Sequence, residues 1–177
     1  AEMEMEALFS ASAMKSVPFA STLGNHEARN VSTDTPNPFA SVTKYHYNLP
    51  NDDSYSGHHV DCNTSGNFWF RNGDVLVVGI NAVQHTTSVF RHSQPEHNAA
   101  YIKAAMDANK DAKWRVLINH VPPYSFIGGF AEPPKLRERF AEMKIDQFDF
   151  DVVFTGHQHS YSRSKQLLTD DDTKYKN

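Results

Sequence analysis

Histidines follow three apolar segments of the sequence, each at the point where a strand is expected to end. The run ending at Thr22 precedes Asn25 and His26, the run ending at Ile118 precedes Asn119 and His120, and the run ending at Phe154 precedes His157 and His159. Imidazole nitrogens and amide oxygens together suit zinc, iron or manganese. Histidine is also a frequent general acid or base. These residue types therefore point to a metal site with acid–base chemistry beside it.

The spacing of these residues predicts how they would meet. The carboxyl ends of parallel strands lie side by side in an open α/β sheet, so the loops that leave them converge. We therefore expect Asn25, His120 and His157 to come together at one end of a central sheet, with His159 beside them. In an extended chain His157 and His159 point to the same side, where they could reach one ion or two adjacent ions. Gly156 would let the backbone approach closely.

The hydrophobic pattern indicates the elements that must position these residues. Strands are expected at 17–22, 68–70, 75–80, 114–119 and 151–155, with Asn72-Gly73-Asp74 as the turn of a hairpin. Helices are expected at about 2–15, 93–109 and 134–143, and Lys103 should pair with Asp107 on the outer side of the second one. Because helices and strands alternate in the later half, the pattern predicts an α/β layered fold with a mixed sheet.

The composition limits the kind of protein that the chain can be. Its 177 residues, 39% of them hydrophobic, suit one domain with a sizeable core. A net charge of −4 without any Lys/Arg-rich block predicts no nucleic-acid partner. No apolar stretch is long enough for a membrane span, so no membrane partner is expected. Cys62 is the only cysteine, so neither an internal disulfide nor a cysteine-built zinc site is expected.

Three motifs, in this order, resemble those of the calcineurin-like metallophosphoesterase family, and most closely its purple-acid-phosphatase-like branch. They are Gly24-Asn25-His26-Glu27, Asn119-His120 before Pro122, and Gly156-His157-Gln158-His159-Ser160-Tyr161-Ser162-Arg163. The resemblance implies a layered α/β/β/α sandwich in which residues 1–177 form one metallophosphoesterase domain. It also implies a hydrolase for phosphate esters that is secreted or exposed on the cell surface.

The resemblance further implies a set of metal ligands. Asn25, His120 and His157 would bind one metal ion, and His159 would bind the other. The complete domain would then hold a dinuclear centre of iron, manganese or zinc. Two cations about 3.5–4 Å apart can clamp the attacking and leaving oxygens and lower the pKa of a bound water.

The same resemblance implies contacts with the substrate. His26 would be the catalytic residue, holding a phosphate oxygen or donating a proton to the leaving alkoxide. Tyr161 and Arg163 would either contact the phosphate or pack against a strand. The substrate would be a phosphate ester of a small molecule or of a protein.

The sequence departs from the family in its aspartates. The family needs an Asp-x-His or Asp-x-Gly motif and a metal-bridging Gly-Asp motif, both before the position of Gly24. No Asp in the chain is followed two residues later by His or Gly, and turn chemistry explains Gly73-Asp74. We therefore expect a truncated domain that lacks its first strands and whose open sheet edge favours self-association. Neutral ligands alone would hold one ion but not two adjacent dications.

Two other functions are compatible with the sequence. The first is a catalytically incomplete fragment or pseudo-phosphatase that binds phosphate or a single metal without turnover. The second, a single-zinc hydrolase with serine or water as nucleophile, ranks last because neither Gly-x-Ser-x-Gly nor His-Glu-x-x-His occurs. Aspartate motifs encoded before Ala1 would favour the enzyme over both.

Overall fold

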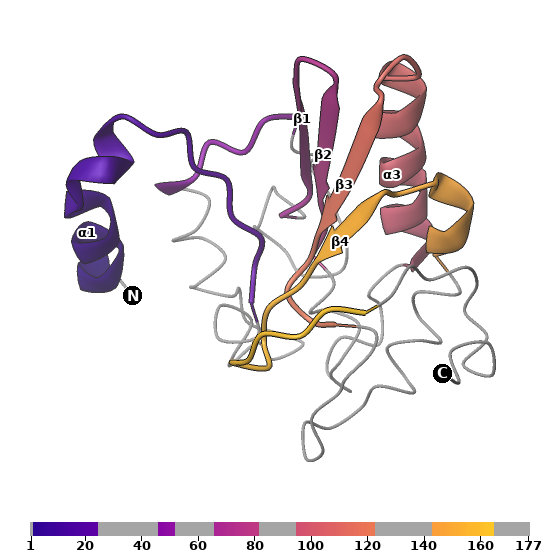
Figure 1. The fold of residues 1–177 in the computed structure, drawn as a ribbon. Helices are drawn as coiled ribbons and strands as arrows, with labels where there is room; N and C mark the ends of the chain where they lie inside the picture. The colour runs from indigo at the N-terminus through magenta and orange to yellow at the C-terminus, as the bar shows by residue number, and fades with distance from the viewer. Residues whose placement is uncertain (1, 25–45, 52–65, 82–94, 123–142, 165–177) are drawn as a thin grey trace, which may run out of the picture.

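A four-stranded sheet forms the centre of the protein (Figure 1). The computed structural model describes residues 2–24, 46–51, 66–81, 95–122 and 143–164. β1 (Phe68–Asn72) and β2 (Val75–Gly79) pair antiparallel, whereas β3 (Trp114–Ile118) and β4 (Val152–Phe154) extend the sheet in parallel, in the order β1-β2-β3-β4. The sheet is therefore mixed, and the α/β class expected from the sequence is confirmed.

Two glycines make the β1–β2 hairpin possible. Gly73 in the turn has a φ of 58°, a left-handed conformation that glycine adopts without a Cβ penalty. Gly79 lies opposite Phe68, and a Cβ at Gly79 would come within 2.2 Å of the phenyl ring. The ring of Phe68 therefore occupies the space that a side chain at position 79 would need. The predicted hairpin is confirmed, including its Asn72-Gly73-Asp74 turn.

One helix covers one face of this sheet. α3 (Pro95–Ala108) packs Tyr101, Ile102 and Ala105 against the inward side chains of β2 and β3. The buried core that results contains Leu76, Val78, Ile80, Tyr101, Ile102, Ala105, Ala112, Leu117, Val121 and Met143. Lys103 and Asp107 form the expected pair on the outer side at 2.5 Å. The helix predicted at 93–109 is thus confirmed as an amphipathic packing element.

The other face of the sheet and its β4 edge are less covered. Val116 and Ile118 of β3 are half-buried on that face, because they alternate with the buried Leu117. All of β4 is exposed, with Val152 and Val153 at 41% and Phe154 at 58%. Within the described ranges β4 pairs with β3 alone. An apolar strand with an open edge is suited to further strand pairing.

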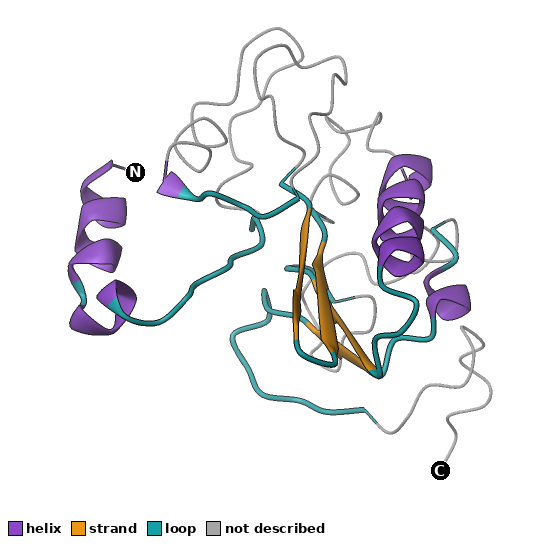
Figure 2. Ribbon diagram, turned by 90° about the horizontal axis from the view of Figure 1, so that it is seen from above, coloured by secondary structure: helices purple, strands orange, loops and turns teal. Residues whose placement is uncertain are grey.

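The amino-terminal segment differs from the sequence expectation in two places. Instead of one helix over 2–15, the chain forms α1 (Glu2–Ser10) and a 3₁₀-helix, η1 (Ser12–Lys15). The break falls at Ala11, whose ψ is 133°, and Ser10 Oγ donates a hydrogen bond to the carbonyl of Ala7. Such back-bonding by serine competes with the helical pattern. Seen from above, α1 and α3 lie on opposite sides of the sheet (Figure 2).

The strand predicted at 17–22 is wrong. This segment has no regular secondary structure, and Val17 and Phe19 are 58% and 48% exposed. Pro18 has no N–H to donate to a strand ladder, and Thr22 Oγ1 reaches the carbonyl of Ile80 instead, at 2.9 Å. The apolar residues therefore do not mark a strand here. The helix predicted at 134–143 falls outside the described residues, apart from the buried Met143.

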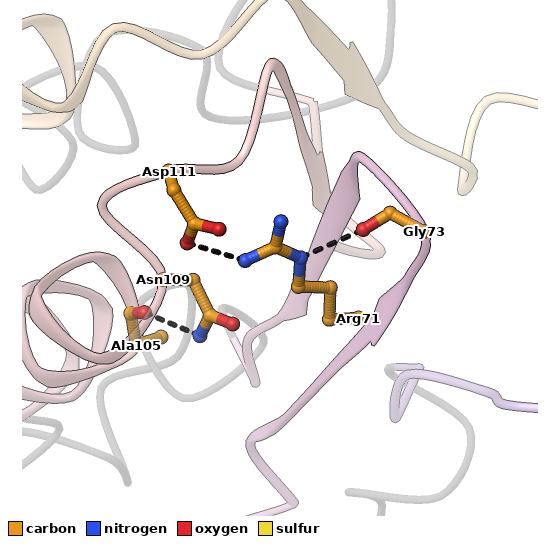
Figure 3. A network of polar contacts seen from close by, with 5 residues as sticks. All are labelled: Arg71, Gly73, Ala105, Asn109 and Asp111. Atoms are coloured by element: carbon orange, nitrogen blue, oxygen red, sulfur yellow. Dashed lines mark hydrogen bonds and ion pairs between the residues drawn. The ribbon is translucent and has the colours of Figure 1, made fainter.

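Ion pairs link the β1–β2 hairpin to the loop between α3 and β3. Arg71 donates to Asp111 Oδ1 at 2.5 Å and to the carbonyl of Gly73 at 2.7 Å, while Asn109 donates to the carbonyl of Ala105 (Figure 3). The hydrogen bond from Arg71 holds the pKa of Asp111 below its ordinary range. Lys113 and Asp74 form a second pair at 2.8 Å. These contacts are structural, and they lie at the end of the sheet opposite the motif histidines.

A short 3₁₀-helix, η4 (Ile145–Phe148), leads into β4. Ile145 and Phe148 pack against the core, and left-handed residues, Lys144 and Asp149, bound this element. Among the described residues no helix combines the length and the apolar character that a bilayer crossing requires.

Candidate metal site at the ends of β3 and β4

Two histidines meet where the parallel strands β3 and β4 end. The strand register pairs Ile118 with Phe154. Beyond the strands, the backbone N–H of Asn119 donates to the carbonyl of Phe154 at 3.0 Å, and the N–H of Gly156 donates to the carbonyl of His120 at 2.9 Å. These bonds hold the segments that follow β3 and β4 side by side, and His120 Nε2 lies 3.3 Å from His157 Nδ1. The rings meet edge to face, with centroids 5.1 Å apart.

Gly156 lies against the ring of His120. A Cβ at this position would lie 3.4 Å from His120 Nδ1 and 3.8 Å from His120 Cε1, which are ordinary van der Waals distances. The close approach of the backbone expected at this glycine is present, since its N–H donates to the carbonyl of His120 at 2.9 Å. An alanine would nevertheless fit beside the ring.

The spacing of the two nitrogens matches what one metal ion requires. Two imidazole nitrogens that ligate a tetrahedral zinc ion at about 2.0–2.1 Å lie about 3.3–3.4 Å apart. The observed separation of His120 Nε2 and His157 Nδ1 is 3.3 Å. Both imidazoles are half-buried, so they reach the surface without being fully solvated. Without a metal, the same contact is a hydrogen bond between the two rings, whose direction depends on their tautomers.

The sequence argument assumed that the segment after β4 is extended, but the structure shows a turn there. His157 and His159 have positive φ angles of 69° and 51°, and the N–H of Gln158 donates to the carbonyl of Gly156 at 2.8 Å. This bond closes a three-residue turn around His157. The argument that alternation in an extended strand places both imidazoles on one side is therefore wrong. His159 is exposed, whereas Gln158 between them is buried.

This turn is strained, which is common at functional sites. A non-glycine residue held in a sparsely populated backbone region costs about 1–3 kcal/mol. Two such residues, His157 and His159, lie in one three-residue stretch. The turn re-aims His157 toward β3, and its side chain meets His120 as a result.

Asn119 is a residue of this region that sequence reasoning named only as part of a motif. It is 1% exposed, and in the part of the chain that the structure describes its side-chain oxygen and nitrogen have no hydrogen-bond partner. A buried polar group left in this condition costs about 1–3 kcal/mol. Most buried side-chain polar atoms are paired, so an unpaired amide calls for an explanation.

Other asparagines form a buried network at the same end of the sheet. The backbone N–H of Asn81 donates to Asn67 Oδ1, and Asn67 Nδ2 donates to Asn98 Oδ1, both at 2.8 Å. The network joins the start of β1, the end of β2 and the first turn of α3. The sequence held a signal for part of this arrangement, because the dipeptide Ile-Asn occurs at the carboxyl ends of both β2 and β3, as Ile80-Asn81 and Ile118-Asn119.

The remaining predicted site residues are either outside the described residues or exposed. Asn25 and His26 lie outside the described residues. Gly24 just before them is buried, and the hydrogen bond from Thr22 to Ile80 brings this segment to the carboxyl end of β2. Tyr161 is 90% exposed and Arg163 is exposed.

Carboxylates do not accompany the histidine pair in the described ranges, where no three side chains among His, Cys, Asp and Glu gather closely enough to hold a metal ion. The arrangement as described thus offers two neutral nitrogen ligands at the ends of neighbouring strands. Two imidazole nitrogens are fewer than the three or four protein ligands of a typical zinc site, so they would form only part of one.

The family model described as calcineurin-like phosphoesterase matches residues 2–161 of the chain.

Proposed function

The chain belongs to the calcineurin-like phosphoesterase family, and we propose that it provides the histidine ligands of a metal-dependent phosphoesterase site. Family membership assigns the general activity, hydrolysis of phosphate esters. The observation that carries the proposal is the 3.3 Å contact of His120 Nε2 with His157 Nδ1 at the ends of β3 and β4. A cation bound there would polarise a phosphate oxygen and lower the pKa of an attacking water.

The roles of the chain's own residues follow from their places. His120 and His157 hold the cation, and Asn25 and His159 complete the neutral ligand set. The exposure of His159 and the left-handed turn around it leave this imidazole free to reach a second ion. Iron, manganese and zinc all suit such nitrogen and oxygen donors.

His26 acts on the substrate in this proposal. It holds a phosphate oxygen or donates a proton to the leaving group, and Tyr161 and Arg163 contact the phosphate from the exposed segment after β4. This arrangement is that of the purple-acid-phosphatase-like branch, with a phosphate ester of a small molecule or protein as substrate. The exposed side chain of Arg163 supports a role in binding an anion from solution.

Two carboxylates complete the site in our proposal, and they are carried by strands that add to the sheet beside β4. The absence of the family's aspartate motifs from the sequence supports this inference. The apolar strand β4 next to the histidine pair also supports it, because within the described ranges β4 pairs with β3 alone and is exposed. By itself the 177-residue chain would then be a catalytically incomplete fragment that binds one metal ion without turnover.

Zinc or manganese binding to the 177-residue chain tests the proposal. Equilibrium dialysis of the wild type should find one bound ion that is lost in the variants His120→Ala and His157→Ala. The matched control is His46→Ala, since the ring of His46 stacks on Phe9. Metal binding that survives both substitutions at the pair would overturn the site.

Turnover of 4-nitrophenyl phosphate tests the proposal that additional strands carry the two carboxylates. We expect a rate close to the uncatalysed background for the 177-residue chain with added manganese, iron or zinc. Two tightly bound ions with robust turnover would refute the inference that the carboxylates lie on additional strands.

A further inference from the structure

Asn119 immediately precedes His120 in the sequence, and its side-chain amide has no hydrogen-bond partner among the described residues. The proposed metal site gives this amide no role. Asn119 follows Ile118 at the end of β3, two residues after Leu117, which is fully buried under α3. Strand alternation therefore places the Asn119 side chain on the α3 face of the sheet, beside Ile80, while the neighbouring His120 projects differently and meets His157.

An apolar residue would suit this position better in the cation-free protein. Ile80 and Leu117 are both completely buried, and the Asn119 amide is 99% buried with neither its oxygen nor its nitrogen hydrogen-bonded inside the described structure. Leucine has nearly the same shape and needs no partner. Within the described residues the polarity of the side chain thus adds no hydrogen bond that would stabilise this state.

The backbone of Asn119 is coupled mechanically to the histidine pair. Its N–H donates to the carbonyl of Phe154, and one residue later the carbonyl of His120 accepts the N–H of Gly156. A small shift of residue 119 would move His120 relative to the turn that carries His157. The amide is therefore placed where hydrogen bonds to it would fix the separation of the two imidazoles.

We infer that Asn119 is a positioning residue for a divalent cation, whose amide gains its hydrogen-bond partners when an ion occupies the His120–His157 pair. This inference rests on the proposed metal site. In the loaded protein the amide holds the backbone before His120, and in the cation-free protein it stays buried without a partner. Ion binding and the hydrogen bonding of Asn119 are thus coupled.

The test measures thermal stability and zinc affinity separately. The variant Asn119→Leu is compared with the wild type, and the control is Asn109→Leu, because Asn109 is also buried but donates to the carbonyl of Ala105 at 2.8 Å. The unfolding midpoint is measured in EDTA, and the zinc dissociation constant by isothermal titration with zinc chloride alone. His120→Ala serves as the reference for loss of the site.

For Asn119→Leu we expect an unfolding midpoint in EDTA that is equal to or above that of the wild type. The zinc dissociation constant should rise about tenfold, equivalent to about 1.4 kcal/mol. For Asn109→Leu we expect the reverse, a lower midpoint with unchanged zinc affinity. The two variants would then change different quantities, zinc affinity for Asn119→Leu and the unfolding midpoint for Asn109→Leu. This difference distinguishes a residue that positions the metal ligand His120 from one that only stabilises the fold.

Two results would overturn the inference. A lower midpoint in EDTA with unchanged zinc affinity for Asn119→Leu would show that the amide is paired with a permanent water. Unchanged values of both quantities would show that the amide is not coupled to the site. Zinc binding by the wild type that His120→Ala does not reduce would instead refute the proposed metal site itself.

Discussion

The buried asparagine network supports the end of the sheet that carries the candidate site, and its contribution can be worked out from Asn67. This side chain is completely buried and makes hydrogen bonds to the Asn81 N–H and to Asn98 Oδ1, both at 2.8 Å. The substitution Asn67→Ala removes both bonds. Each buried partner left behind costs about 1–3 kcal/mol, so the free energy of unfolding should fall by about 2–6 kcal/mol.

Urea denaturation of the 177-residue chain measures this loss. With a slope of about 2 kcal/mol per molar urea, the midpoint should fall by roughly 1–3 M while the slope stays constant. Asn98→Ala removes the 2.8 Å bond from Asn67 Nδ2 and a longer bond, at 3.5 Å, to the carbonyl of Asn81. It should cost less than Asn67→Ala, because the 2.8 Å bond from the Asn81 N–H to Asn67 Oδ1 survives. Asn48→Ala, at an exposed position outside the helices and strands, is the neutral control.

The reasoning would be refuted by a loss of less than about 1 kcal/mol for Asn67→Ala, a typical net value for one ordinary hydrogen bond. An equal loss for Asn98→Ala and Asn67→Ala would also contradict it, because the bond that fixes the end of β2 would then contribute nothing. A changed urea slope would indicate that the denatured state, and not the network, had changed.

Further substitutions test the packing, the electrostatics and the open edge. Gly79→Ala should lower the free energy of unfolding by about 1–3 kcal/mol or more in a denaturant titration, because the new Cβ would lie 2.2 Å from the ring of Phe68. The lowered pKa of Asp111 makes its pairing with Arg71 stabilising above the ordinary aspartate pKa, and this contribution is lost as the pH falls through the lowered value. Asp111→Asn should therefore make stability depend less steeply on pH in that acidic range, as thermal unfolding at several pH values would show; an unchanged slope would contradict the pairing. Val153→Lys should reduce self-association through the β4 edge in light scattering, and an unchanged apparent mass in a wild type that associates would exclude that edge.

Local sequence patterns predicted the elements that are built from neighbouring residues. The Asn72-Gly73-Asp74 turn fixed the hairpin, and helical spacing identified the buried face of α3 with Ile102 and Ala105. The apolar segment at 17–22 misled the same reasoning, because its composition is strand-like but Pro18 and its contacts with β2 keep it irregular. The composition of a segment shows how much apolar surface it can bury. Whether the segment forms a strand depends on whether a neighbouring strand can pair with it.

The sequence by itself predicted which residues would bind a metal ion, and it indicated that His120 and His157 follow two strands of one sheet. Only the tertiary structure decided that their nitrogens lie 3.3 Å apart and that residues with positive φ turn His157 toward His120. It also decided that the amide of Asn119 is buried with no hydrogen-bond partner among the described residues. The physical reason is range. Turn and helix preferences act over a few residues, whereas the register of β3 against β4 and the burial of Asn119 are set by contacts between segments more than thirty residues apart.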